Sequence, residues 1–480
     1  MADLMELIGR LRAHQDGRAI CAATHRQVTI APHALVIAPL AMAGEDTAIH
    51  AIAIGRIGGP LEFMSIPDPR VRDDQYVLVE WLGDRIEAYY ATCRATGEYP
   101  QIWVSSGAAA GHLDILADRL RFTRDAPKIK RAGELLTYAT ERMPIAGQQA
   151  LMTATGALAL HYCTGQQEGE DEHLGAFLTW LDPPAGIAIA RAVEAAERQV
   201  MGVKTDPEFD RNELQPLVSA YNQARKDGAS QAELRRRAKT IEYKLSPIVT
   251  TIYNAIQRAL GYLRDFPPAG VLADLADHER DQFVSFMNSR DLEMPLPYRD
   301  SPKAGAFKIA ARELAASNLD SGALYGDTMA LARARLNGSV LSGSLRNHTQ
   351  ERVPRKTIHR FDVVTTQTNL HLRSGDELAL FDDPRLRCLV TNVSRTDAES
   401  TVSFQVTAGM KKPGVPPEGT SVDIAPPPPD WSQIIRDRKQ MSKRLQTMPW
   451  THVVGDLPTP QARPSIVQPN DLLAAVEGLK

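Results

Sequence analysis

Short apolar segments followed by amphipathic stripes open the chain. Short apolar runs of strand length occur at residues 34–39 and 49–57, and residues 61–66 and 101–105 are two further predicted strands. From residue 76 apolar positions recur every three or four residues, which is typical of a helix with one face on a core. A second helical pattern follows the last apolar segment. The order of three strands, helix, strand and helix predicts an α/β domain over residues 1–125.

Residues 126–337 favour helices. Between residues 231 and 265 the apolar positions, among them Leu234 and Ile241, keep to one helical face throughout. Another long helical pattern covers residues 302–336. We therefore expect a helical middle domain over residues 126–337 that ends in a long, stalk-like helix.

Beyond the helical region the period changes to two. Val402, Phe404 and Val406 alternate with polar residues, as in a strand with one buried face. Segments of similar strand character are residues 357–365, 369–373, 377–381 and 386–393. So many short strands predict a small β-barrel over residues 338–430. We expect residues 431–480 to hold a basic helix and a Pro-rich tail.

These patterns predict an α+β multidomain protein: an N-terminal α/β domain, a helical middle, and a small C-terminal β-barrel flanked by stalk-like helices. The 480 residues carry a net charge of −3, which excludes a generally basic nucleic-acid coat. The 4 cysteines are far apart, so we expect reduced thiols in a cytoplasmic protein. Charged residues interrupt every apolar stretch, and no membrane association is expected.

Motifs of the common enzyme classes are missing from the sequence. The dipeptide Gly-Lys of a Walker A loop does not occur, and neither do G-x-S-x-G or H-E-x-x-H. No G-x-G-x-x-G follows a predicted strand. We therefore assign no catalytic residue and no cofactor, and expect the chain to have no enzymatic activity of its own.

Two groups of residues nevertheless invite a metal hypothesis. One consists of His161, Cys163, Glu168, Glu170, Asp171, Glu172 and His173, whose donor types suit zinc or manganese. Its spacing matches no known pattern, so a solvated acidic loop is the favoured interpretation and no metal ligand is assigned. The other consists of the carboxylates Glu45, Asp46, Asp73, Asp74, Asp114 and Asp118.

The second group raises the question of a metal-dependent nuclease, which needs carboxylates converging from sheet and helix to hold two ions. The N-terminal unit resembles a degenerate RNase H-like domain. An active nuclease of that class would carry an acidic residue in its first strand, whereas residues 34–39 are entirely apolar. A folded domain without catalysis is the favoured interpretation.

Basic residues gather near both ends of the predicted barrel. The group before it is Arg352, Arg355, Lys356 and Arg360, and the group after it is Arg436, Lys439 and Lys443. A third cationic stretch, residues 235–239, lies on the long helix of the middle domain. Such cations contact phosphates and give affinity without sequence choice. We assign the seven residues of the first two groups as candidate nucleic-acid contacts; solvated helix faces are the alternative.

The C-terminal third resembles the segment that precedes the ATPase core in superfamily 1 helicases of the nonsense-mediated-decay and immunoglobulin-switch-binding type. Residues 302–336 would match the outgoing stalk helix of that family. LHLRSGDELALFDD and RLRCLVTNVS resemble barrel strands, and DWSQIIRDRKQMSKRL resembles the returning helix. In that family the Walker A loop follows a helix such as NDLLAAVEGL, but the sequence stops there, so no catalytic residue is carried over.

The resemblance implies an accessory protein that binds single-stranded nucleic acid and works with a helicase or ATPase supplied by another chain. Two other hypotheses stay open. One is a metal-dependent nuclease that uses the N-terminal carboxylates. The other is a scaffold that binds only protein, with its basic groups facing solvent.

Overall fold

The computed structural model describes residues 4–45, 48–294, 296, 300, 302–354, 356–396, 398–411, 414–428 and 443. The chain divides into two compact units, residues 1–296 with 315–429 and residues 297–314 with 430–480. Helices and sheets both contribute, and the fold is α+β.

A mixed five-stranded sheet with the order β4-β3-β2-β5-β6 forms the centre of the N-terminal part. β2, β3 and β4 pair antiparallel, while β5 and β6 continue the sheet in parallel with β2. The strands are β2 (Leu35–Ala41), β3 (Ile49–Arg56), β4 (Glu62–Ser65), β5 (Ile102–Val104) and β6 (Leu151–Thr153). A separate two-stranded sheet joins β1 (Ile20–Cys21) to β7 (Tyr162–Cys163).

β2 is apolar and buried at every position, and β3 is buried at seven of its eight positions, because helices cover both faces of the sheet. Successive residues of a strand point to opposite faces. Leu35 and Ile37 accordingly lie in one core, whereas Val36, Ala38 and Leu40 lie in the other. This double burial explains why the predicted strands show continuous apolar runs rather than alternation.

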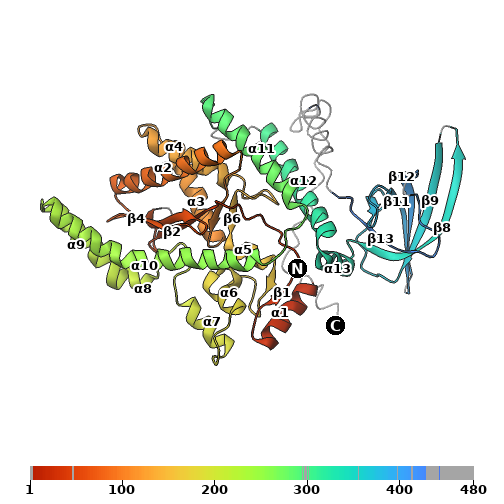
Figure 1. Cartoon of the computed structure of the whole chain (residues 1–480), viewed down its shortest axis with the longest axis horizontal. Coiled ribbons are helices and arrows are strands. Elements are labelled where there is room, and N and C mark those ends of the chain that lie inside the picture. Colours follow the sequence, from red (N-terminus) through yellow and green to blue (C-terminus); the bar gives the residue numbers. More distant parts are fainter. Residues whose placement is uncertain are drawn as a thin grey trace, which may run out of the picture. The chain divides into compact units, whose positions relative to one another are not determined.

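One core is closed by α2, α3, α4 and α11, and the other by α5, α6, α9 and α10 (Figure 1). The helices over the first core are α2 (Arg72–Thr96), α3 (Gly107–Leu120), α4 (Pro127–Thr140) and α11 (Leu272–Asp291). Those over the second core are α5 (Ala154–Ala159), α6 (Leu174–Leu181), α9 (Gln215–Lys226) and α10 (Gln231–Arg264). The remaining elements of this part are α1 (Leu4–Asp16), α7 (Ile189–Glu197), α8 (Pro207–Phe209), a 3₁₀ turn (Glu170–Glu172) and a π turn (Asp210–Leu214).

The predicted order of three strands, helix, strand and helix is confirmed for residues 35–120. The sheet does not end at residue 125, however, because β6 adds a fifth strand beside β5. Both cores also draw residues from beyond that position, including Leu135 and Ile256. The predicted boundary at residue 125 therefore lies inside a shared core.

Two helices lead into the C-terminal part: α12 (Pro302–Gly326) and α13 (Thr328–Asn337). The single helix predicted over residues 302–336 is thus divided at Asp327, which caps α13 by accepting hydrogen bonds from Met329 N and Ala330 N. At the other end of α13, Gly338 has a φ of 80°, and a Cβ there would collide with the carbonyl oxygen of Asn369. Only glycine fits this turn into the first strand of the next sheet.

Six strands form a closed barrel in the order β10-β11-β12-β9-β8-β13. They are β8 (Leu341–Val353), β9 (Lys356–Thr365), β10 (Glu377–Leu380), β11 (Arg387–Arg395), β12 (Ser400–Ala408) and β13 (Ser421–Ala425). The rings of Phe361 and Phe404 stack inside at a centroid distance of 5.2 Å. β9 to β12 confirm four predicted segments, whereas residues 369–373 form no strand and β8 and β13 lie outside the predicted ones.

Candidate nucleic-acid interface

The longest barrel strands, β8 and β9, form a two-stranded ribbon whose far end extends beyond the other strands (Figure 1). They pair antiparallel from Ser344 with Val364 to Val353 with Lys356. Arg352 and Arg360, predicted to precede the barrel, therefore lie within its first two strands. We call residues 346–360 the ribbon.

Arg352 and Arg360 lie on opposite faces of the ribbon. Arg352 pairs with Thr357, and Arg360 pairs with Thr349. The side chains of successive pairs point to alternate faces, and these two pairs are three steps apart. The guanidinium of Arg360 is held by Glu351, with Nη1 and Oε2 2.6 Å apart. Arg352 is exposed and has no carboxylate within ion-pair distance among the described residues. Arg352 is thus the better placed of the two to contact a phosphate.

A further cation on the ribbon, Arg346, was missed by the sequence analysis. It pairs in register with Asp362 and is exposed, without an ion pair in the described part of the chain. Beside it, Asn347 has a φ of 53° in a register shift, and its Nδ2 donates to Asp362 Oδ2 at 2.9 Å. Residues 341–353 are mostly polar, so no pattern in the sequence marked β8 as a strand that could present this side chain.

A pair of histidines packs where the ribbon meets the barrel. His348 Nε2 lies 3.3 Å from His359 Nδ1, and the two rings stack at a centroid distance of 5.5 Å. Gln350 Nε2 lies 3.2 Å from the other nitrogen of His359. Burial, followed by the nearby His348, lowers the pKa of His359. The lowered pKa favours a neutral imidazole at His359, and the stacked pair links β8 to β9 beside the register shift.

Several predicted contact residues lie outside the described residues or have no described side chain. Arg355, Arg436 and Lys439 lie outside the described residues. For Lys356 the backbone alone is described, opposite Val353, and Lys443 is helical and exposed. Of the seven predicted contacts, the described side chains of the ribbon are those of Arg352 and Arg360.

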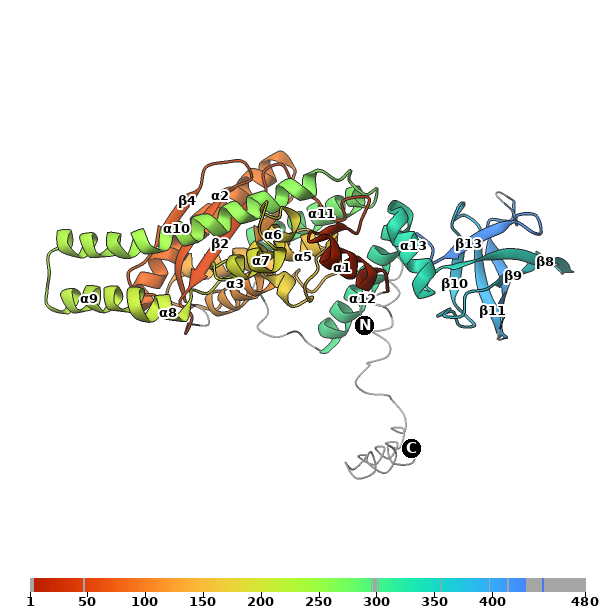
Figure 2. The same ribbon diagram turned by 90° about the horizontal axis from the view of Figure 1, so that it is seen from below.

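The cationic stretch of α10 divides into paired and unpaired residues. Glu233 forms ion pairs with Arg236 and Arg237, at 2.9 and 2.8 Å. Arg235 and Lys239 are exposed and form no ion pair with any described residue. They are four residues apart and therefore share one side of the helix. α9 and α10 lie side by side and extend beyond the sheet (Figure 2).

The residues around His161 have structural roles. Its Nδ1 lies 2.6 Å from Ala157 O, and its Nε2 accepts a hydrogen bond from Gln27 N. Asp171 pairs with Arg10 at 2.8 Å, and Glu172 accepts from the backbone nitrogen of Gly107. These contacts fix the loop against Arg10 and against the start of α3.

Three of the N-terminal carboxylates have separate arginine partners. Glu45 pairs with Arg70, Asp74 with Arg225 and Asp118 with Arg121. Asp46 lies outside the described residues. Within the part of the chain that the structure describes, no group of three or more His, Cys, Asp or Glu residues is arranged to hold a metal ion.

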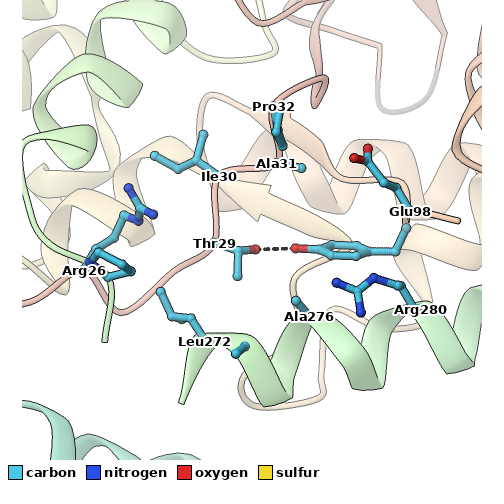
Figure 3. Close-up of a pocket in the computed structure, with 12 residues that line it drawn as sticks. Arg26, Thr29, Ile30, Ala31, Pro32, Glu98, Leu272, Ala276 and Arg280 are labelled. Atoms are coloured by element: carbon cyan, nitrogen blue, oxygen red, sulfur yellow. Dashed lines mark hydrogen bonds between the residues drawn. The ribbon is translucent and has the colours of Figure 1, made fainter. Parts of the chain in front are cut away.

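Away from the barrel, a pocket of about 280 Å³ opens beside α11 (Figure 3). Its wall comes from the segment before β2, its floor from α11 and its far end from the turn before β5. In Figure 3, Arg26 lies at one end, and Glu98 and Arg280 lie at the other. Between them, Thr29 Oγ1 and Tyr99 OH are 2.6 Å apart. Sequence analysis gave no signal for this pocket, because its lining comes from three distant segments.

Comparison with known protein families, curated proteins and solved structures gives no match for this chain. Among the described helices, none has both the length and the apolar character needed to cross a bilayer.

Proposed function

We propose that the chain is a non-catalytic, nucleic-acid-associated accessory protein that works with a helicase or ATPase supplied by another chain. The observation that carries the proposal is the pair of exposed ribbon arginines, Arg346 and Arg352, neither of which forms an ion pair with a described carboxylate. Cations without internal partners are available to neutralise phosphates and to release counterions.

The shape of the ribbon also supports contact with a polyanion. A two-stranded ribbon that extends beyond its barrel can lie along a nucleic acid without burying the barrel itself. It places Arg346 and Arg352 on opposite faces, so that a strand passing the ribbon meets a cation on either side. Arg235 and Lys239 on α10 provide a second cationic surface of the same kind.

Two features support the resemblance of the C-terminal third to the helicase segment and of the N-terminal unit to an RNase H-like domain. The helices α12 and α13 are followed directly by a small barrel. A stalk helix followed by a barrel is also the order in the superfamily 1 helicases that the C-terminal third resembles. In the N-terminal part, β2 is the central strand of a mixed sheet, and its seven residues are all buried and apolar. A degenerate RNase H-like domain would have such a first strand.

The proposal is tested by titrating a fluorescent single-stranded oligonucleotide with the full-length chain at several salt concentrations. Arg346→Glu with Arg352→Glu should weaken binding at least tenfold. It should also lower the slope of log K against log salt by roughly 1.4, at about 0.7 per lost phosphate contact. The charge-matched control is Arg191→Glu on α7 with Arg198→Glu at the residue that follows the helix, both exposed and both outside the ribbon. Equal effects of the two double variants would refute a specific role for the ribbon.

The predicted triplet after the barrel has its own test in the same assay. Charge reversal of Arg436, Lys439 and Lys443 to Glu should lower the salt slope by roughly 2, again at about 0.7 per contact. An unchanged slope with unchanged affinity would assign these three residues to a solvated face.

The same titration separates the alternative functions. Absence of any binding by the wild-type chain would favour the protein-only scaffold, whose apolar docking should depend little on salt. Degradation of the oligonucleotide only when Mg²⁺ or Mn²⁺ is added would favour the nuclease. ATP turnover by the purified chain alone, at a normal enzymatic rate, would contradict the proposed dependence on another chain's ATPase.

A further inference from the structure

Arg26 lines the pocket beside α11. Hydrogen bonds fix its backbone, whereas its positive charge is not balanced by a described carboxylate. Arg26 N donates to Pro267 O at 2.7 Å, and Arg26 O accepts from Ala269 N at 3.0 Å. The Nε of Arg26 donates to Val28 O at 2.9 Å. These bonds orient the guanidinium so that it forms one end of the pocket (Figure 3).

No described carboxylate lies within ion-pair distance of Arg26, and its two Nη atoms form no hydrogen bond with any described group. Its surroundings are unfavourable for a positive charge. Partial burial, followed by repulsion from nearby Arg264, lowers the pKa of Arg26. A cation taken partly out of water is costly unless an anion accompanies it. The geometry therefore leaves a place for an anion beside the two Nη atoms.

The rest of the pocket is suited to an organic group rather than to a bare ion. Ile30 and Pro32 lie on one side of the space, and Leu272 and Ala276 from α11 lie on the other (Figure 3). Small-molecule sites typically combine such apolar walls with a few fixed polar groups, and begin at roughly 300 Å³. The pocket, at about 280 Å³, has room for a ring-sized body next to a charged head group.

We propose that this pocket binds a small organic oxyanion, a carboxylate or a phosphate, with its charged group on the Nη atoms of Arg26 and its body over Leu272 and Ala276. The planar guanidinium matches either head group with two parallel hydrogen bonds. At the opposite end Glu98 is accompanied by Arg280, which pairs with Asp277. The ligand is thus a single anionic head group, held by Arg26, on an apolar body. This site is independent of the ribbon and of the proposed nucleic-acid function.

The test uses three probes that share one ring: phenyl phosphate, benzoate and benzyl alcohol. Calorimetric titration of the full-length chain should show binding of at least one of the two anions, and the comparison between them identifies the preferred head group. Benzyl alcohol should bind at least tenfold more weakly. Inorganic phosphate should also bind more weakly than phenyl phosphate, because it leaves the apolar walls uncovered. Equal binding of alcohol and anions, or no binding of either anion, would overturn the proposal.

Two variants locate the binding. Arg26→Gln should lower anion affinity at least tenfold, whereas Arg191→Gln, an exposed arginine on α7, should leave it unchanged. Because Arg26→Gln also removes the bond to Val28, Ala276→Phe provides a second approach: it fills the pocket from α11 and leaves Arg26 intact. Melting curves confirm that both variants fold. Retention of full affinity by either folded variant would show that the probe binds elsewhere, which overturns the assignment.

Discussion

The carboxylate of Asp327 accepts hydrogen bonds from both the backbone nitrogen and the hydroxyl of Thr24, at 3.0 and 2.8 Å, although 303 positions separate the two residues. The same carboxylate caps α13. Asp327 is buried, and its hydrogen bonds from Thr24, Met329 and His25 outweigh the opposing effect of burial, so that its pKa is lowered. One side chain therefore ties the helix that leads into the barrel to the N-terminal segment.

Replacing Asp327 by Ala should destabilise the protein far more than loss of a cap alone. A helix cap is worth about 1 kcal/mol, and a hydrogen bond to a charged group about 1.5–3 kcal/mol. Asp206→Ala is the matched control, because Asp206 caps α8 with two backbone hydrogen bonds and is exposed. Urea unfolding should show a loss at least about 1.5 kcal/mol larger for Asp327→Ala. Equal losses would mean that the Thr24 contacts contribute nothing.

The sequence predicted the strands that are buried on both faces, because their runs are almost wholly apolar. β2 and β3 fall within one or two residues of their predicted segments. The helical period likewise predicted α10 almost to its ends. β2 and β3 bury nearly all of their residues, and α10 buries one continuous face, so the burial of each element leaves a clear apolar pattern in the sequence.

Elements with little burial were not predictable in the same way. In β8 only Leu341 and Leu345 are fully buried, and the rest of the strand is mostly polar and partly or fully exposed. β6 is three residues long, too short to establish a period. The cation Arg346 and the pocket at Arg26 were missed for a related reason: each depends on segments brought together by tertiary contacts. The sequence shows how many basic residues the chain has, but it does not show which of them form ion pairs with acidic residues.

A buried ion pair joins the turn after α4 to α11 and should be essential for stability. Arg142 donates to both carboxylate oxygens of Glu279, at 2.8 and 2.5 Å, and Glu279 is 1% exposed. Glu279 Oε1 also accepts from Gln149 N just before β6. Glu279→Ala leaves the guanidinium of Arg142 without its buried partner, so we expect a loss of about 3–5 kcal/mol in urea unfolding.

The control for this pair is the exposed one between Arg94 and Asp291, on α2 and α11. Asp291→Ala should cost less than about 1 kcal/mol, because water solvates both charges when the pair is broken. The double variant Arg142→Met with Glu279→Met should recover much of the loss. A loss below about 1 kcal/mol for Glu279→Ala would show that the pair is not buried as described.

Phe404 should contribute strongly to the stability of the barrel core. It is fully buried on β12, pairs in register with Phe361 on β9, and stacks on that ring. Phe404→Ala should cost about 3–5 kcal/mol and lower the melting temperature of the full-length chain. Gln405→Ala, the next residue along the strand, is the control and should have little effect, since its side chain points to the other face. Similar melting curves for both variants would mean that the register of β12 is wrong.

His50 should make the stability of the α/β part depend on pH in a predictable direction. It lies on β3 and is fully buried, and burial lowers its pKa from 6.5 to about 4. Asp68 opposes this shift and Arg70 adds to it, but burial is the dominant cause. Since the unfolded chain takes up the proton more readily than the folded one, stability is full above pH 6.5 and falls as the pH decreases towards 4.

The variant His50→Leu removes this titration while keeping the volume and the apolar surroundings. Between pH 7.5 and pH 5.0 the wild-type chain should lose about 2 kcal/mol more unfolding free energy than His50→Leu, as the two pKa values require. Urea unfolding at both pH values measures the difference, and His33→Leu, at an exposed position, should retain the wild-type loss. Identical pH profiles for wild type and His50→Leu would mean that the imidazole has the same pKa in the folded and unfolded states. That result is incompatible with a histidine sealed between the sheet and its covering helices.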